Sequence, residues 1–323
     1  MKLAKTYNFV KKDLNIIEKS LKNTIQADHI VLQDASTQLL EAGGKRIRPV
    51  FVLLSGQMGS YHIDRFKTVA VALELIHMAT LVHDDVVDNS ELRRGKPTVK
   101  HSYGNRVAMY TGNYILALAI ESITKIKDPN IHQLLSNTLV EVCLGEVEQI
   151  EFKYNWDQQL RHYLRRIKRK TALLIATSCK LGAMAGMTTP EEANRLYQYG
   201  YYIGMSYQII DDILDFTSTE KELGKPIASD LLQGNLTLPV LYAMKDQAFN
   251  DLLRDTFAHP DEVDPVHFEK LLFMLKKSDA IEKSYQLSEL YLNKALEVLK
   301  PLPDLEAKQI LQEIAQSIGD RRS

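Results

Sequence analysis

The sequence predicts an all-α fold in a single domain, and three observations support this. Apolar residues recur at three- and four-residue intervals through most of the 323 residues. Nowhere does period-2 alternation of β-branched residues persist, so no β-sheet is expected. Two acidic clusters, at residues 84–88 and 211–215, each end an apolar helical segment. Two such clusters can share a metal only inside one bundle, so we expect one helical domain over residues 1–323.

The composition narrows the class of protein. The net charge is −1, with 45% hydrophobic and 25% charged residues, so neither nucleic acid nor an anionic membrane would attract the chain as a whole. The two cysteines, Cys143 and Cys179, form no CxxC pair, which argues against a disulfide framework and a zinc site. No stretch reaches about 18 uninterrupted apolar residues. We expect a cytoplasmic protein with at most transient membrane contact.

The first segment with chemical character follows a helical region at residues 11–42. A Gly43-Gly44 pair interrupts the periodicity and leads into Lys45-Arg46-Ile47-Arg48-Pro49, which places three cations before an apolar helix. Glycines let the backbone approach an anion, and a helix start adds the positive end of its dipole. The segment therefore predicts a phosphate-binding site. A helix end followed by a solvated basic turn is the alternative.

A helix over residues 66–82 leads into the first acidic cluster. If Asp84 and Asp88 lie on a helix, their i,i+4 spacing places them about 40° apart on one face, with converging oxygens. Mg²⁺ suits such a pair, because it takes one or two carboxylates and fills its other positions with water and phosphate. Arg93 and Arg94 follow, before a Gly95-Lys96-Pro97 turn expected to end the helix. A solvated acidic helix end is the alternative.

The middle of the chain adds helices at residues 109–126 and 131–150, with Gly112 and Gly145 inside them. Close helix packing or room for a ligand would explain these two glycines. Residues 161–170 contain six basic side chains, most of which should form a solvated helix face. Lys170 and Thr171 lie by the face expected to be buried. We therefore expect them to point inward, where a lysine needs an anion.

The second acidic cluster repeats the first. Asp211 and Asp215 again stand at i,i+4 after an apolar and aromatic helix, and Gln208 lies one turn before Asp211. Two copies of one arrangement are hard to explain as solvated surface. A loop containing Gly224-Lys225-Pro226 follows and could close over a phosphate. The segments at 271–274, 281–299 and 305–318 have helical spacing and no evident chemistry, so we expect them to be scaffold.

Together these features predict a reaction of a diphosphate. Carboxylates facing each other across a helical cavity could hold several Mg²⁺ ions around one diphosphate and neutralise the charge of the leaving group. The apolar walls suit a long hydrocarbon better than a nucleotide or a sugar. No GxGxxG, GxxxxGK[ST] or GxSxG motif occurs, and no protein nucleophile is evident.

The motifs resemble those of the trans-isoprenyl diphosphate synthases over nearly the whole chain. The resemblance rests on the residues 43–49, both DDxxD motifs, Arg93-Arg94-Gly95, Lys170-Thr171, Gln208 and Gly224-Lys225-Pro226, in this order. It implies a helical bundle of the isoprenoid synthase type with a central cavity. It also implies a prenyltransferase that ionises an allylic diphosphate, adds isopentenyl diphosphate to the cation and loses a proton, which the departing diphosphate accepts.

The resemblance also implies a role for each matching residue. Asp84, Asp88 and Asp211 would bind Mg²⁺ directly, and Asp85, Asp212 and Asp215 would support the ions through water. Together with Asp215, the direct ligands are the candidate metal site. The allylic diphosphate would be held by Arg93, Lys170, Thr171, Gln208 and Lys225. Isopentenyl diphosphate would be held by Lys45, Arg48, His77 and Arg94. The candidate catalytic set is Asp84, Asp85, Asp88, Lys170, Gln208, Asp211, Asp212 and Lys225.

Product length can be approached from helix geometry. Leu73, Ile76 and Ala79 lie 11, 8 and 5 positions before Asp84, on nearly the same face and successively closer to the acids. Members of the family with short products place large aromatic residues just before the first motif, whereas Ala79 and Thr80 would leave the cavity open. We expect an all-trans product of C30 to C40, with C35, as for a menaquinone side chain, favoured.

Several other assignments compete with this one. A class I terpene cyclase shares the fold and the first motif but needs no isopentenyl site, so residues 43–49 argue against it. An HD-type phosphohydrolase would use His77 and His83-Asp84 and would leave Asp211 and Asp215 unexplained. A non-catalytic subunit would be expected to have lost its acids, yet all six are present.

The expected assembly depends on which members of the family the chain resembles. Residues 142–146 and 163–167 are similar to those of two-component members, in which a catalytic chain works with a smaller, dissimilar regulatory subunit. A heterodimer with such a subunit is therefore implied. A homodimeric single-chain synthase of hexaprenyl or octaprenyl diphosphate is the alternative, and farnesyl diphosphate is the expected allylic substrate of both.

Overall fold

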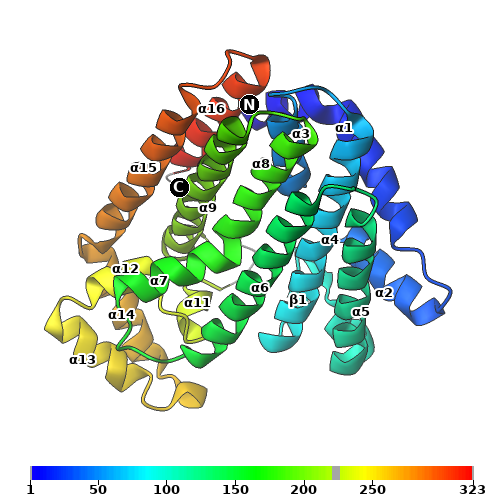
Figure 1. Cartoon of the computed structure of the whole chain (residues 1–323). Coiled ribbons are helices and arrows are strands. Elements are labelled where there is room, and N and C mark those ends of the chain that lie inside the picture. Colours follow the sequence, from blue (N-terminus) through cyan, green and yellow to red (C-terminus); the bar gives the residue numbers. More distant parts are fainter. Residues whose placement is uncertain (1, 220–225, 322–323) are drawn as a thin grey trace. The chain divides into compact units, whose positions relative to one another are not determined.

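The computed structural model describes residues 2–219 and 226–321, without the side chains of residues 2–4. Helices dominate this part of the chain (Figure 1), which confirms the all-α prediction. The contacts divide the chain into two compact units, each assembled from separate segments. The first unit contains residues up to 137, 174–198 and 301–314, and the second contains residues 138–173, 199–300 and 315–323. That both form one domain stays a prediction.

The first unit is built mainly from helices of the N-terminal half. Its helices are α1 (Lys2–Thr24), α2 (Ile30–Glu41), α3 (Ile47–Gly56), α4 (Ile63–Val87), α5 (Val99–Ile123) and α8 (Leu173–Ala185). It also holds the beginning of α6 (Pro129–Glu151), the beginning of α9 (Pro190–Thr217) and most of α16 (Glu306–Gly319). The helix α4 packs against α1, α3 and α5, and α2 packs against α5 (Figure 1).

The helix α4 forms the core of the first unit, because nearly every residue from Val69 to Val82 is buried. Among the described residues it is the one helix long and apolar enough to cross a membrane, with a mean hydropathy of 1.3 in its most apolar window. Of that window, 67% is buried inside the protein, as expected of a core helix. Gly112 of α5 allows close packing here, since a Cβ at this position would lie 2.3 Å from Nε2 of His83.

The chain leaves α4 earlier than expected. The helix ends at Val87, and a hairpin follows with β1 (Leu92–Arg93) antiparallel to β2 (Lys96–Pro97). Arg94 and Gly95 form its turn with φ values of 54° and 75°, the left-handed backbone that two-residue hairpins need. The expectation that the Gly95-Lys96-Pro97 turn ends the helix is therefore wrong, and these residues close the hairpin. No further strand occurs in the described part of the chain.

The second unit surrounds the second acidic helix end. It contains the rest of α6 and α9, α7 (Leu160–Ile167), a π-helical turn η1 (Lys168–Ala172), α11 (Ser229–Leu232), α12 (Leu238–Ala243), α13 (Gln247–Thr256), the 3₁₀ turn η2 (Pro260–Glu262), α14 (Pro265–Lys277) and α15 (Ala280–Leu299). The helix α12 packs against α7, α14 and α15. The apolar core of the second unit contains Trp156, Phe216, Phe249 and Phe257.

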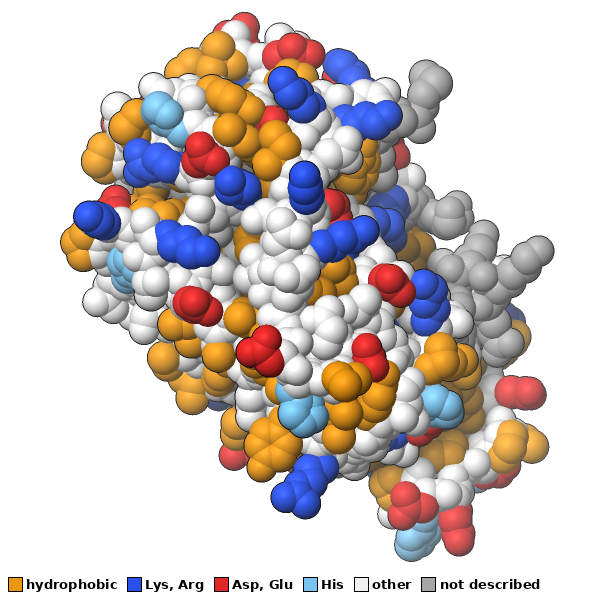
Figure 2. All heavy atoms as spheres, turned by 90° about the vertical axis from the view of Figure 1, so that its right-hand side faces the viewer, with side chains coloured by type: hydrophobic (Ala, Val, Ile, Leu, Met, Phe, Trp, Pro, Cys, Tyr) orange, Lys and Arg blue, Asp and Glu red, His pale blue; other side chains and the backbone are white. Residues whose placement is uncertain are grey.

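The surface agrees with the composition. On the face that Figure 2 shows, charged side chains of both signs alternate with small apolar areas, and no single sign of charge dominates. Such a surface gives no general attraction for a polyanion. Anion binding therefore depends on local groups of side chains.

Candidate active site

The first aspartate motif occupies the C-terminal end of α4, where the helix dipole is negative and acids need cations beside them. Asp84 and Asp88 are half-buried, and Asp88 caps the helix. Asp85 is only 2% exposed and accepts hydrogen bonds from the Arg93 guanidinium at 2.6–3.1 Å through both carboxylate oxygens. Asp85 therefore orients Arg93, whose planar fork suits both a carboxylate and a phosphate.

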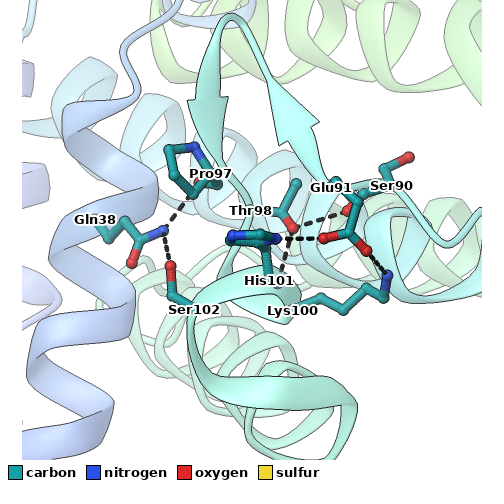
Figure 3. A network of polar contacts seen from close by, with 8 residues as sticks. All are labelled: Gln38, Ser90, Glu91, Pro97, Thr98, Lys100, His101 and Ser102. Carbon is teal, nitrogen blue, oxygen red and sulfur yellow. Dashed lines mark hydrogen bonds and ion pairs between the residues drawn. The ribbon is translucent and has the colours of Figure 1, made fainter.

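A network of polar contacts fixes the start of the hairpin that carries both arginines (Figure 3). The Glu91 carboxylate pairs with Nζ of Lys100 at 2.7 Å and with Nδ1 of His101, both in the first turn of α5. The hydrogen bonds from Lys100 and His101 lower the pKa of Glu91 to about 2. The Thr98 hydroxyl donates to the carbonyl of Ser90 at 2.8 Å and accepts from the His101 N–H, which caps α5.

The other strand of the hairpin is attached to α2. Nζ of Lys96 donates to the carbonyl of Glu41 at 2.7 Å. Nε2 of Gln38 donates to the carbonyl of Pro97 at 2.9 Å and to Oγ of Ser102 at 3.0 Å (Figure 3). With both strands held, the turn that carries Arg94 has a defined position.

The basic segment between α2 and α3 lies against this hairpin. A Cβ at Gly44 would lie 2.6 Å from Nη1 of Arg94, so a larger residue here would have to displace the end of that side chain. Lys45 is exposed, and Arg48 is half-buried in the first turn of α3. The structure thus brings Gly44 and Arg94 together.

His77 of α4 belongs to the same group. Burial and four nearby guanidinium groups lower the pKa of His77 well below its ordinary value. These groups belong to Arg48, Arg94, Arg93 and Arg46. The imidazole is therefore neutral at physiological pH and can donate one hydrogen bond.

In the second aspartate motif, which lies in the second unit, one aspartate is again half-buried and the next is buried. Asp211 is half-buried, whereas Asp212 is 3% exposed. Asp212 accepts from Nε2 of Gln208 at 2.8 Å and from the buried Tyr163 hydroxyl at 2.7 Å. Oε1 of Gln208 in turn accepts from the Thr171 hydroxyl at 2.6 Å. Asp212 therefore fixes the amide orientation of Gln208 and, through it, the hydroxyl of Thr171.

The protonation of Asp212 reflects its depth. Burial, and then the charge of Asp230, raises the pKa of Asp212 to about 7. The hydrogen bonds from Gln208 and Tyr163 and the charge of Arg166 act in the opposite direction. A carboxylate in this environment serves as an acceptor for neighbouring side chains.

The two remaining positions of this motif differ in exposure. Asp215 is 1% exposed and accepts from the Ser229 hydroxyl and the Asp230 N–H, both at 3.2 Å, at the start of α11. Asp211 accepts from Nη1 of Arg321 at 3.3 Å. A positive side chain thus lies beside Asp211.

Lys170 and Thr171 lie in the π-helical turn η1. The expectation that Lys170 points inward is wrong: it is exposed, and its Nζ donates to Oε1 of Gln149 at 2.9 Å. The π turn adds a residue to one helical turn, which changes the directions of the side chains from those of a regular α-helix. Gly204 of α9 permits this turn, since a Cβ there would lie 2.4 Å from Cα of Ala172.

The basic stretch around η1 is less solvated than expected. Arg166 is 7% exposed and donates to Oε1 of Gln158 at 2.8 Å and to the carbonyl of Leu236. Arg169 pairs with Glu141 and Glu148 at 3.0 and 2.8 Å. Gly145 makes room for Arg169, because a Cβ there would lie 2.6 Å from its Cβ.

Two further predictions concern the residues of α4 that would limit product length and Lys225 in the loop that could close over a phosphate. Leu73, Ile76 and Ala79 are at most 1% exposed in α4, and the hydroxyl of Thr80 donates to the carbonyl of His77 at 2.8 Å. Lys225 lies outside the described residues, so its assignment stays a prediction.

The donor atoms available at both motifs suit Mg²⁺. They are carboxylate oxygens, which hard divalent cations prefer over nitrogen or sulfur. Across residues 2–219 and 226–321, no group of three or more His, Cys, Asp or Glu side chains converges as a metal site. An ion held by one or two carboxylates and completed by water and phosphate fits this arrangement.

Sequence reasoning missed several residues that organise the site. Tyr163 and Arg166 gave no signal, because their partners are distant in sequence. Glu74 could have been noticed, since a single carboxylate inside the apolar segment before Val82 needs a buried partner. That partner is Arg46.

The chain belongs to the polyprenyl synthetase family, whose model matches residues 29–271. It is therefore a prenyltransferase, as the sequence predicted.

The chain is similar to several named members of this family. The chain is 56% identical over 322 residues to heptaprenyl diphosphate synthase component 2 of Bacillus subtilis, covering 100% of this chain and 92% of that protein. The crystal structure of a heptaprenyl diphosphate synthase from Staphylococcus aureus is similar with a TM-score of 0.92 and 44% identity, covering 97% and 99% of the two chains. A polyprenyl synthase from Caulobacter crescentus, complexed with calcium and isoprenyl diphosphate, has a TM-score of 0.92 and 27% identity, with 98% and 97% covered.

Proposed function

We propose that this prenyltransferase condenses isopentenyl diphosphate with an allylic diphosphate, farnesyl diphosphate being favoured, to give heptaprenyl diphosphate for a menaquinone side chain. The observation that carries the proposal is the group formed by Gly44, His77 and Arg94 with the arginines around them, next to the aspartates that end α4. The names of the Bacillus and Staphylococcus relatives support the product. The segment at residues 43–49 argues against a terpene cyclase.

The proposed roles follow from charge and exposure. Lys45, Arg48, His77 and Arg94 bind isopentenyl diphosphate, with the neutral imidazole as a hydrogen-bond donor. Arg93, held by Asp85, presents its guanidinium to the allylic diphosphate. The same substrate is also bound by Lys170, Thr171, Gln208 and Lys225. Asp212 and Asp215 act by fixing neighbouring groups.

The proposed cofactor is Mg²⁺, with Asp84, Asp88 and Asp211 as its protein ligands. When bound, such ions neutralise the charge that develops on the leaving diphosphate. The calcium in the Caulobacter relative supports a divalent cation. The apolar residues of α4 exclude water from the allylic cation, and the departing diphosphate accepts the final proton.

The proposed assembly is a heterodimer with a small, dissimilar subunit, in the cytoplasm. The term component 2 in the name of the Bacillus relative supports a partner. The free cysteines, Cys143 and Cys179, agree with a reducing compartment.

The decisive experiment supplies the purified chain with farnesyl diphosphate, labelled isopentenyl diphosphate and Mg²⁺. It is run with and without a candidate small subunit of the component 1 type from the same organism, and the dephosphorylated products are sized by reversed-phase chromatography. We expect a C35 product that requires the partner and disappears with a chelator. Activity of the chain alone would contradict the two-component assembly, and release of free diphosphate without chain growth would contradict the reaction.

Product length gives a separate test. Ala79→Phe places a ring on the face of α4 that also holds Ile76 and Leu73, and we expect a shorter product. Met78→Phe, at a neighbouring buried position about 100° around the helix, is the matched control and should keep the C35 product. An unchanged product from Ala79→Phe would show that this face does not limit the chain.

A further inference from the structure

The segment that enters α3 contains an arginine in an unusual backbone conformation. Arg46 has φ 47° and ψ 39°, in the left-handed region, which costs a residue with a side chain about 1 kcal/mol or more. Its neighbours Lys45 and Arg48 are the candidate phosphate ligands. A strained residue between two binding residues needs contacts that hold it there.

The Arg46 side chain supplies those contacts. Its guanidinium pairs with Glu18 of α1 and with Oε1 of Glu74 in α4, the latter at 3.1 Å, and Nη2 donates to the carbonyl of Leu40 at 3.4 Å. Both acids lie 28 residues from Arg46 in sequence. One side chain thus ties the segment to three helices of the first unit.

The Arg46–Glu74 ion pair is shielded from solvent, whereas the Glu18 side chain is 34% exposed. The Arg46 side chain is 11% exposed, and that of Glu74 is 4% exposed. Burial opposes the positive charge, yet the hydrogen bond to Glu18 and the charges of Glu74 and Glu18 outweigh it and raise the pKa of Arg46. Removal of Arg46 would leave the buried Glu74 carboxylate without its ion pair, and removal of Glu74 would leave Arg46 with only the more exposed Glu18.

Arg46 and its ion-pair partners lie close to the candidate ligands for isopentenyl diphosphate. The Tyr7 hydroxyl donates to the carbonyl of Lys45, which fixes the residue before Arg46. A Cβ at Gly44 would lie 3.2 Å from Nη1 of Arg46 and 2.6 Å from Nη1 of Arg94. His77 follows Glu74 by one turn of α4, on the same face of the helix.

We propose that Arg46 is a positioning residue for isopentenyl diphosphate: by bridging Glu18 and Glu74 it holds its neighbours Lys45 and Arg48 close to His77 without binding the substrate itself. This inference rests on the proposed isopentenyl site. It assigns a task to a residue and to two acids that the reaction does not otherwise use.

The test measures KM for both substrates in the assembly that shows synthase activity. Arg46→Gly relaxes the left-handed backbone and removes the guanidinium, and Glu74→Gln removes the buried charge while keeping the shape. We expect each to raise KM for isopentenyl diphosphate about tenfold, while kcat and KM for the allylic diphosphate change less than about twofold. Arg46→Lys keeps the charge but cannot bridge both acids. Its KM for isopentenyl diphosphate should lie between those of the original chain and of Arg46→Gly.

A matched control is Lys5→Met, which breaks the Lys5–Glu313 ion pair of α1 outside the proposed site and should leave both KM values unchanged. Should Arg46→Gly not fold, Glu18→Gln and Glu74→Gln carry the test. Equal changes in both KM values, or a fall in kcat alone, would overturn the positioning role.

Arg48→Ala in the same assay separates the proposed isopentenyl site from the proposed role of Arg46. If Arg48→Ala leaves KM for isopentenyl diphosphate unchanged, the proposed site is wrong. If Arg48→Ala raises it and Arg46→Gly does not, only the role of Arg46 is wrong.

Discussion

Asp85 and Asp212 occupy the same place in the two motifs, and both are buried against polar side chains instead of solvent. The preceding aspartates, Asp84 and Asp211, are half-buried. The identical letters of DDxxD therefore cover two tasks. The half-buried carboxylate is the proposed ligand of the cation, and the buried one orients a side chain that we propose to bind phosphate.

Gly44 offers a test at the scale of one atom. In Gly44→Ala the new Cβ would displace the end of the flexible Arg94 side chain, so we expect KM for isopentenyl diphosphate to rise several-fold with little loss of stability. Gly43→Ala is the matched control, because Gly43 has φ 74° and open space around it. It should cost about 1 kcal/mol of stability and leave KM unchanged. Steady-state kinetics and urea unfolding measure both, and the reverse pattern would refute the placement of Arg94.

Tyr163 offers a test of the buried network. Tyr163→Phe leaves an oxygen of Asp212 buried without its donor, so we expect a loss of about 1–3 kcal/mol of stability and a higher KM for the allylic diphosphate. A double-mutant cycle with Asp212→Asn, followed by urea unfolding, measures the coupling between the two side chains. Strictly additive effects would show that the hydrogen bond does not hold the network together.

At the scale of elements, the hairpin β1–β2 carries the two arginines that we propose to bind the two substrates, yet two strands of two residues cannot be stable alone. Its position depends on contacts with α2 and α5 (Figure 3). An element this short is placed by its neighbours, which is why its polar contacts are so dense.

The hairpin network predicts a pH dependence. The pKa of Glu91 is about 2 in the folded chain against 4.5 ordinarily, so its carboxylate stabilises the fold above pH 4.5, and this contribution is lost as the pH falls towards 2. Glu91→Gln should therefore be less stable than the original chain at pH 7, and the two should converge as the pH falls through that window. Urea unfolding at several pH values measures this. Salt should reduce the difference, because Glu91 is exposed, and a gap independent of pH would count against the ion pairs.

At the scale of the whole molecule, ligand linkage tests whether both motifs serve one reaction. Mg²⁺ with inorganic pyrophosphate should raise the melting temperature by a few degrees, as expected for a ligand at 100-fold its Kd. Asp84→Asn and Asp211→Asn should each reduce this shift. Asp64→Asn, which breaks a surface ion pair with Lys67 in α4, is the control and should keep it. A shift that survives loss of either motif would show that the other binds alone.

Much of the fold and the site could be predicted because the signals are local. Helical periodicity located α4, α9 and α15, and the i,i+4 acids located the ends of α4 and α9. The π turn at Lys168–Ala172 could not be predicted, since it depends on packing against Gly204, and Lys170 within this turn is exposed. The hairpin was missed because its strands are too short to show alternation.

The sequence by itself determined the helical class, the two acidic motifs and the basic segment at residues 43–49, because each is written in neighbouring residues. Only the tertiary structure decided which acids are buried and what they hold: Asp85 with Arg93, Asp212 with Tyr163, and Glu74 with Arg46. Burial is a property of the packed chain, and partners as far apart as Tyr163 and Asp212 leave no common pattern in the sequence. The candidate chemical groups therefore lie in short sequence motifs, whereas the contacts that position them join residues distant in sequence.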